Sequence, residues 1–109
     1  MTHSNEMVEL VEEYLPKEGN LQAILDLIKE STETIKGVKG LVMTKTLAPQ
    51  KEGDPVYSIS TWNSQEDFNA FLQSDNFKKL LNSGIVNQAQ ELTKMINART
   101  FNVVNGWHG

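Results

Sequence analysis

The chain has 109 residues, the length of a single domain, with 39% hydrophobic and 22% charged residues, as in soluble globular proteins. Its net charge is -4, and its 10 Lys and Arg are scattered, so no basic stripe is present that could neutralise the phosphates of a nucleic acid. There is no Cys, which excludes disulfides, thiolate nucleophiles and Cys-based metal sites, and fits a reducing compartment.

The N-terminal segment "MTHSNEMVELVEEYLPKEG" has neither a basic start nor a continuous apolar core, unlike a secretory signal. No run approaches the roughly 18 apolar residues that a membrane-spanning helix needs. We therefore expect a cytoplasmic protein that binds neither nucleic acid nor membrane.

The first half of the chain predicts a strand, a helix and a second strand. Residues 7–15 alternate apolar and acidic side chains with period two, which predicts a strand. Asn20 is a candidate N-cap for a helix over residues 21–36, whose apolar face is formed by Leu21, Ile24, Leu25, Ile28 and Ile35. The helix ends at "GVKG", and "LVMTKTL" (41–47) has the composition of a second strand.

The second half begins with a turn-rich segment, "APQKEGDP", and a third strand, "VYSISTW" (56–62). Ser64 and Ser74 are candidate N-caps of the helices that follow, and acidic residues after each suit the helix dipole. A further helix is predicted from the spacing of Ile85, Ala89, Leu92 and Ile96. Arg99 is expected to open a last strand and to pair with an acidic side chain.

The order β-α-β-β-α-β predicts an α+β, ferredoxin-like protomer with a four-stranded antiparallel sheet and helices on one face. The strands carry apolar residues on both faces, so the face without helices needs a cover. A second copy of the chain is the simplest cover. We therefore expect a homodimer formed through the sheet faces.

Residues 41–77, "LVMTKTLAPQKEGDPVYSISTWNSQEDFNAFLQSDNF", contain "W-x-S-x-E-x-F" and then "SDNFK", and "GVKG" precedes them. In this order they resemble the antibiotic biosynthesis monooxygenase domain of the dimeric α+β barrel superfamily. The resemblance extends over about residues 6–104 of a single domain, 1–109. It implies a dimeric α+β barrel with a pocket between each sheet and its helices.

Relatives in that family include cofactor-independent monooxygenases that form quinones from phenolic polycyclic substrates, haem-degrading enzymes, and isomerases. The resemblance implies a small-molecule monooxygenase that oxidises a phenolic or quinone-type compound without a cofactor. A non-catalytic module that binds a small aromatic or apolar ligand, or acts in a stress response, is the first alternative. Atypical haem binding or degradation is the second.

The resemblance also implies site residues. Trp62 and Asn63 match the positions that donate hydrogen bonds to substrate oxygens and stabilise a phenolate or carbanion. We expect the substrate pocket to be lined by Tyr14, Tyr57, Phe71 and Leu81. The alternative roles are structural, because Trp62 can close the end of the barrel by packing, and Asn63 can simply precede the Ser64 cap.

Haem degradation is disfavoured by the same resemblance. The Asn, Trp and axial His of the haem-degrading relatives fall near Glu12, on Phe71 and on Leu81, respectively, and a Leu cannot bind iron. His3 and His108 are in the terminal segments, so the sequence indicates neither a general base nor a metal site. Glu9, Glu12 and Glu13 are interpreted as a solvated strand edge.

Overall fold

The computed structural model describes residues 6–107, and eight elements follow one another along them. In chain order they are β1 (Val8–Pro16), α1 (Leu21–Ile35), β2 (Leu41–Leu47), β3 (Val56–Trp62), α2 (Gln65–Leu72), α3 (Asp75–Asn82), α4 (Ile85–Leu92) and β4 (Thr93–Asn102). No helix among these residues is long and apolar enough to cross a membrane.

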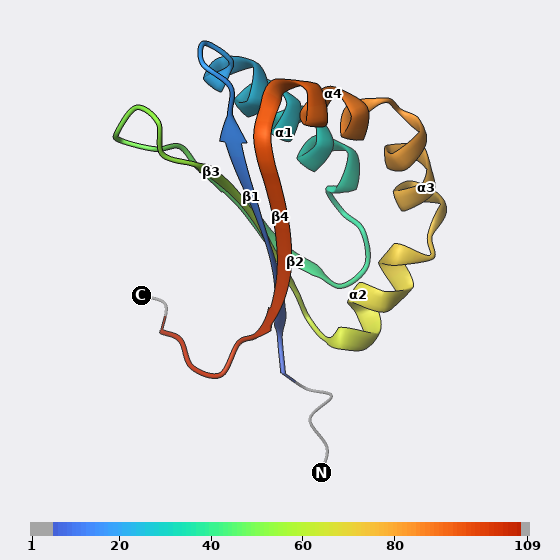
Figure 1. Ribbon diagram of the computed structural model, residues 1–109. Coiled ribbons are helices and arrows are strands. Elements are labelled where there is room, and N and C mark those ends of the chain that lie inside the picture. The colour runs from blue at the N-terminus through green and yellow to red at the C-terminus, as the bar shows by residue number, and fades with distance from the viewer. Residues whose placement is uncertain (1–5, 108–109) are drawn as a thin grey trace.

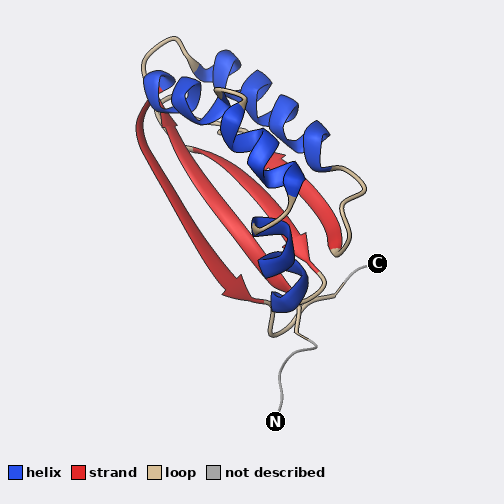
Figure 2. Ribbon diagram, turned by 90° about the vertical axis from the view of Figure 1, so that its right-hand side faces the viewer, coloured by secondary structure: helices blue, strands red, loops and turns tan. Residues whose placement is uncertain are grey.

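The four strands form one sheet in the order β2-β3-β1-β4, and every neighbouring pair is antiparallel. The helices cover one face of this sheet, and the described residues leave its other face without a covering layer (Figures 1 and 2). The ferredoxin-like α+β fold expected from the sequence is therefore confirmed. Because β1 lies between β3 and β4, its side chains occupy the middle of the molecule.

Helix α1 covers residues 21–35, one residue shorter than predicted, and buries Ile24, Leu27, Ile28 and Ile35. Asn20 precedes the helix, but the prediction that its side chain forms the cap is wrong. Its amide Nδ2 instead donates a hydrogen bond to the carbonyl of Leu92, 3.4 Å away, and the backbone N–H of Lys17 donates to the same carbonyl. This side chain thus ties the start of α1 to the end of α4.

The predicted caps of α2 and α3 are confirmed. Ser64 Oγ accepts a hydrogen bond from the backbone N–H of Asp67, 3.1 Å away, and Ser74 Oγ accepts one from that of Phe77, 3.2 Å away. Each bond satisfies one of the free N–H groups in the first turn of its helix. The two caps fix where the chain turns back over the sheet after β3.

The end of α4 differs from the prediction. The helix stops at Leu92, so Ile96 lies in β4 and Arg99 lies in the middle of that strand. Thr93 Oγ1 donates to the carbonyl of Ala89, 2.8 Å away, and β4 then pairs with β1 along its length. Pairing with a central strand here outweighs the helical spacing of four apolar residues.

Two clusters of buried side chains form the core. At one end of the sheet, Trp62 packs against Ile35, Phe68 and Phe71; at the other, Ile24 and Ile28 pack against Val56. Trp62 is stacked on Phe71, with ring centroids 4.8 Å apart, and lies 5.6 Å from Phe68. This aromatic cluster joins the end of β3 to α2.

Candidate active site

A single row of side chains from β1 and β3 faces the helices. Strand side chains alternate between faces, and Leu10 pairs with Ser60 while Glu12 pairs with Ser58. These four residues therefore share the inner face, together with Tyr14 and Trp62 further along the two strands. The row places a carboxylate and two hydroxyls between aromatic ends.

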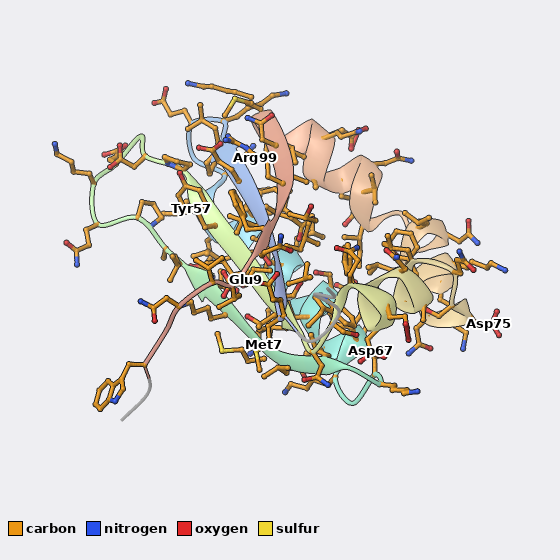
Figure 3. The ribbon with its side chains drawn as sticks, turned by 90° about the horizontal axis from the view of Figure 1, so that it is seen from below. Met7, Glu9, Tyr57, Asp67, Asp75 and Arg99 are labelled. Atoms are coloured by element: carbon orange, nitrogen blue, oxygen red, sulfur yellow. The ribbon has the colours of Figure 1, made fainter. Side chains whose placement is uncertain are left out.

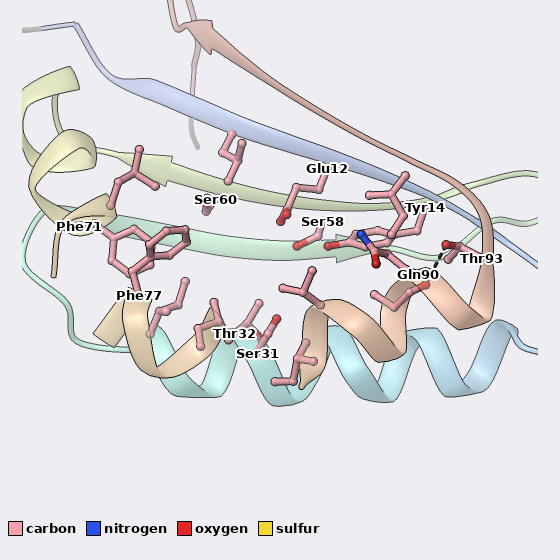
Figure 4. Close-up of a pocket in the computed structure, with 18 of the residues that line it drawn as sticks. Glu12, Tyr14, Ser31, Thr32, Ser58, Ser60, Phe71, Phe77, Gln90 and Thr93 are labelled. Carbon is pink, nitrogen blue, oxygen red and sulfur yellow. Dashed lines mark hydrogen bonds between the residues drawn. The ribbon is translucent and has the colours of Figure 1, made fainter. Parts of the chain in front are cut away.

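A cavity of about 520 Å³ lies between this row and the helices. Figure 4 shows Glu12, Ser58 and Ser60 projecting from the sheet toward the opposite wall, where Ser31 and Thr32 of α1 lie. Apolar side chains make up much of the remaining lining, among them Leu10, Ile35, Phe71, Phe77, Ile85 and Ala89. A volume of this size falls within the range typical of small-molecule sites.

Trp62 forms one end of the cavity, and its side chain is almost fully enclosed, with 1% of its surface exposed. Its indole Nε1–H donates a hydrogen bond to Ser60 Oγ, 3.0 Å away. The indole N–H is therefore satisfied within the protein, and Ser60 keeps its own O–H available to donate. Trp62 packs in the core and lines the cavity at the same time.

Of the other residues named from the sequence, Tyr14 and Phe71 line the cavity, whereas three do not. Asn63 is exposed, and its backbone N–H donates to the carbonyl of Gly40, 2.7 Å away. Tyr57 lies on the other face of β3, because it is one residue out of phase with Ser58. Leu81 is 50% exposed on α3, on the outside of the helical layer.

Glu12 is one of several polar residues that line the cavity but were not predicted as site residues from the sequence. The interpretation of Glu9, Glu12 and Glu13 as a strand edge is wrong, because β1 is a central strand. Glu12 lines the cavity, and burial raises the pKa of its carboxyl, an effect that interaction with Tyr14 partly offsets. The signal was present in the sequence, since Glu12 is in phase with Val8, Leu10 and Tyr14.

The sequence profile of the antibiotic biosynthesis monooxygenase family matches residues 7–82, more than half of the chain. The protein belongs to the antibiotic biosynthesis monooxygenase family. The cavity described above lies between the sheet and helices of this family domain and extends beyond the matched segment onto α4 and β4.

Solved structures share the fold of this monooxygenase-family protein at low sequence identity. SnoaB, a cofactor-independent oxygenase from Streptomyces nogalater, has a TM-score of 0.75 at 13% identity, over 92% of this chain and 95% of that one. A conserved protein of unknown function from Bacteroides thetaiotaomicron has a TM-score of 0.73 at 21% identity, over 92% and 100%. A protein from Shewanella oneidensis has a TM-score of 0.73 at 14% sequence identity, over 91% of this chain and 92% of that one.

The outer face of the sheet carries a separate polar network in this family member. The Tyr57 hydroxyl donates to Glu13 Oε2, 3.0 Å away, and this hydrogen bond raises the pKa of the tyrosine. Arg99 Nη2 lies 4.0 Å from Glu13 Oε1, which confirms the expected pairing with an acid. Glu9 accepts from Thr61 on the same face, and strand alternation places both acids on the face of β1 away from the cavity. Glu9, Tyr57 and Arg99 are labelled in Figure 3.

Two of the three positions compared with haem-degrading relatives, Phe71 and Leu81, offer no iron ligand, whereas the third, Glu12, is a carboxylate that lines the cavity. Phe71 is buried against Trp62, and Leu81 lies outside the cavity. His3 and His108 lie outside the described residues. Among residues 6–107, no group of three His, Cys, Asp or Glu side chains is arranged to hold a metal ion.

Proposed function

We propose that the protein is a small-molecule monooxygenase that binds a phenolic or quinone-forming compound in the cavity and oxidises it with O₂, without a bound cofactor. The observation that carries the proposal is the cavity of about 520 Å³, in which an aromatic, largely apolar wall faces a short row of polar groups. Membership of the monooxygenase family supports the reaction type. The fold shared with a cofactor-independent oxygenase is compatible with it.

The reaction balances without an external reductant. A phenol, or an activated ring CH₂ group, loses a proton to give an anion delocalised over the rings. That anion transfers one electron to O₂, and the two radicals combine to form a peroxide on carbon. Loss of water leaves a carbonyl, so that CH₂ and O₂ become C=O and H₂O. All four electrons come from the substrate.

The cavity offers suitable groups for the anion. Ser60 accepts from Trp62 and can donate its own hydrogen to a substrate oxygen, and Ser58 lies two residues away on the same face. Donors aimed at developing negative charge lower the barrier of such a step, most strongly where water is excluded. Phe71 and Phe77, 5.3 Å apart at the same end, offer aromatic surface for a ring substrate.

We also propose that the protein acts as a homodimer through the outer face of its sheet. Large apolar side chains are exposed on or beside that face: Met7, Val42, Met43, Leu47, Met95 and Phe101. Several large apolar side chains exposed on one face often mark an interface. A second copy of the chain carries the same apolar side chains on its own outer face. Packing the two faces together would remove the apolar side chains of both copies from water.

A matched pair of threonines on α1 provides the test of the site. Thr32 lines the cavity and Thr34 is exposed, yet each hydroxyl bonds a backbone carbonyl of the preceding turn at 3.0 Å. Oxygen uptake is measured with a panel of hydroquinones and hydroxyanthrones for the wild type, Thr32→Trp and Thr34→Trp. The proposal predicts uptake that Thr32→Trp abolishes and Thr34→Trp retains.

If the wild type consumes no oxygen above the rate without protein, the oxygenase proposal fails. Ligand binding that is weakened by Thr32→Trp alone would then indicate a non-catalytic module that uses the same cavity. Equal uptake by both tryptophan variants would place the reaction outside this cavity.

A further inference from the structure

Glu12 is a carboxylate placed inside an apolar cavity. It projects from β1 toward the helices, beside Ser58 on β3 (Figure 4). Its pairing partner on the other side is Ala98 of β4. Neither of the ion pairs found within residues 6–107 involves it. Its neighbours Glu9 and Glu13, by contrast, face the other side of the sheet and accept hydrogen bonds there.

Few ionisable groups share the cavity with this carboxylate. Tyr14 from β1 and Lys94 from β4 line it, whereas β3 contributes Ser58 and Ser60, α1 contributes Ser31 and Thr32, and α4 contributes Gln90. Burial raises the pKa of the Tyr14 hydroxyl, so Tyr14 stays protonated near neutral pH. Lys94 is exposed. Glu12 is thus a carboxyl that lines the cavity and whose pKa is raised above its ordinary value by burial.

We propose that the Glu12 carboxylate is the general base that removes the substrate's proton, an inference that rests on the oxidation proposed above. The C–H or O–H bond breaks, the proton passes to a Glu12 oxygen, and the electron pair stays in the delocalised anion. After O₂ has added, the protonated carboxyl returns this proton to the peroxide. The carboxylate then takes the second C–H proton and passes it to the departing hydroxide, which leaves as water.

The environment of Glu12 suits that role. A carboxylate in water is too weak a base for most phenols. Burial raises the pKa of Glu12, which reduces the difference between its pKa and that of the substrate. Ser58, directly across the strand pair, and Ser60 lie where hydroxyl donors can stabilise the anion as the proton leaves. Proton acceptor and anion donors therefore stand on one face, within one cavity.

Two measurements on 1,8-dihydroxyanthrone, which has one acidic ring CH₂ group, separate this inference from the oxygenase proposal. The first is anaerobic exchange of the CH₂ hydrogens with D₂O, followed by mass spectrometry, which needs the base but no oxygen. The second is oxygen uptake. Both are measured for the wild type, Glu12→Gln and Glu91→Gln, the last being an exposed acid on the cavity-forming helix α4 that does not line the cavity.

We expect Glu12→Gln to reduce both rates by about 10²–10⁴-fold, the usual contribution of a general base, with little change in KM. Glu91→Gln is expected to keep both rates. The wild-type rate should rise with pH through the Glu12 pKa, and this step should be missing from the residual rate of Glu12→Gln. Replacing the partly buried Glu12 carboxylate with a neutral amide should not prevent folding, and an unchanged or higher melting temperature checks this.

The remaining outcomes distinguish the two claims. Wild-type oxygen uptake that Glu12→Gln retains would overturn the role of Glu12 and leave the oxygenase proposal standing. Exchange that depends on Glu12, without oxygen uptake, would support the base and refute the oxygenase. Absence of both activities from the wild type would overturn both.

Discussion

The indole Nε1–H of Trp62 donates its hydrogen bond to Ser60 Oγ, 3.0 Å away and two residues earlier on the same strand. Trp62 is almost fully enclosed, and this hydrogen bond satisfies its indole N–H within the protein. The tryptophan that the sequence suggests as a direct substrate donor is therefore already paired. Under the proposed function, Trp62 would act on a ligand through Ser60, whose O–H is left available to donate.

Replacing Ser60 with Ala leaves the indole N–H of Trp62 buried without an acceptor. We expect the free energy of unfolding to fall by about 1–3 kcal/mol, the cost of such an unpaired group. Urea denaturation followed by tryptophan fluorescence measures it. Ser58→Ala is the matched control on the same face, since no hydrogen bond joins the Ser58 hydroxyl to another described side chain. Equal losses in the two variants would contradict this role of Ser60.

Gly40 occupies a turn that only glycine fits. Its φ is +86°, and a Cβ added there would overlap Cβ of Asp67 in the first turn of α2. Gly37 has a similar φ of +81° but open space around it. We expect Gly37→Ala to cost about 1–2 kcal/mol through backbone strain alone, and Gly40→Ala to cost clearly more. Thermal melts of both variants give the comparison, and equal losses would refute the contact.

The raised pKa of Glu12 predicts a pH dependence of stability. The folded protein holds this proton to a higher pH than the unfolded chain, whose carboxyl has an ordinary pKa of 4.5. The contribution of Glu12 to stability is therefore fully present below that value and is lost as pH rises through the folded-state pKa.

Urea denaturation between pH 4 and pH 8 tests this dependence when the wild type is compared with Glu12→Gln. The difference in unfolding free energy, variant minus wild type, should grow with pH above about 4.5 and then level off. Parallel curves would show that the carboxyl titrates normally.

The proposed dimer predicts different effects for two exposed apolar residues. Phe101 is 48% exposed on the outer face of β4, and Leu81 is 50% exposed on α3. A charge at the sheet face should disrupt an interface, while the same charge on the helical layer should not. Light scattering at micromolar concentration should give a dimeric mass for the wild type and Leu81→Glu, and a monomeric mass for Phe101→Glu. A monomeric wild type would refute the dimer.

The sequence predicts most of the fold because its local signals agree with the tertiary contacts. Period-two alternation identifies β1 and β3, helical spacing identifies α1, and Ser64 and Ser74 cap helices as expected. The prediction fails where a contact with a residue distant in sequence determines the local structure. Asn20 donates a hydrogen bond to the carbonyl of Leu92, and the segment after Leu92 pairs with β1 as β4, although Ile96 continues the helical spacing of α4.

The site was less predictable than the fold. Strand alternation alone separates Glu12 from Glu9 and Glu13, but the neighbours on each side of β1, and hence the burial of Glu12, follow from the strand order. Trp62 lines the cavity and Tyr57 does not, because strand alternation places them on opposite faces of β3. The cavity is lined by residues of seven elements, β1, α1, β3, α2, α3, α4 and β4. Their side chains are far apart in sequence, so no local sequence pattern predicts that they meet.

The most direct test of the account uses ¹⁸O₂ with 1,8-dihydroxyanthrone and the protein freed of added metals and cofactors. A monooxygenase reaction in the cavity should leave one ¹⁸O atom in each quinone molecule and the other in water. Thr32→Trp should abolish this incorporation, while Thr34→Trp should not. A product without ¹⁸O, or incorporation at the rate found without protein, would contradict a monooxygenase reaction in this cavity.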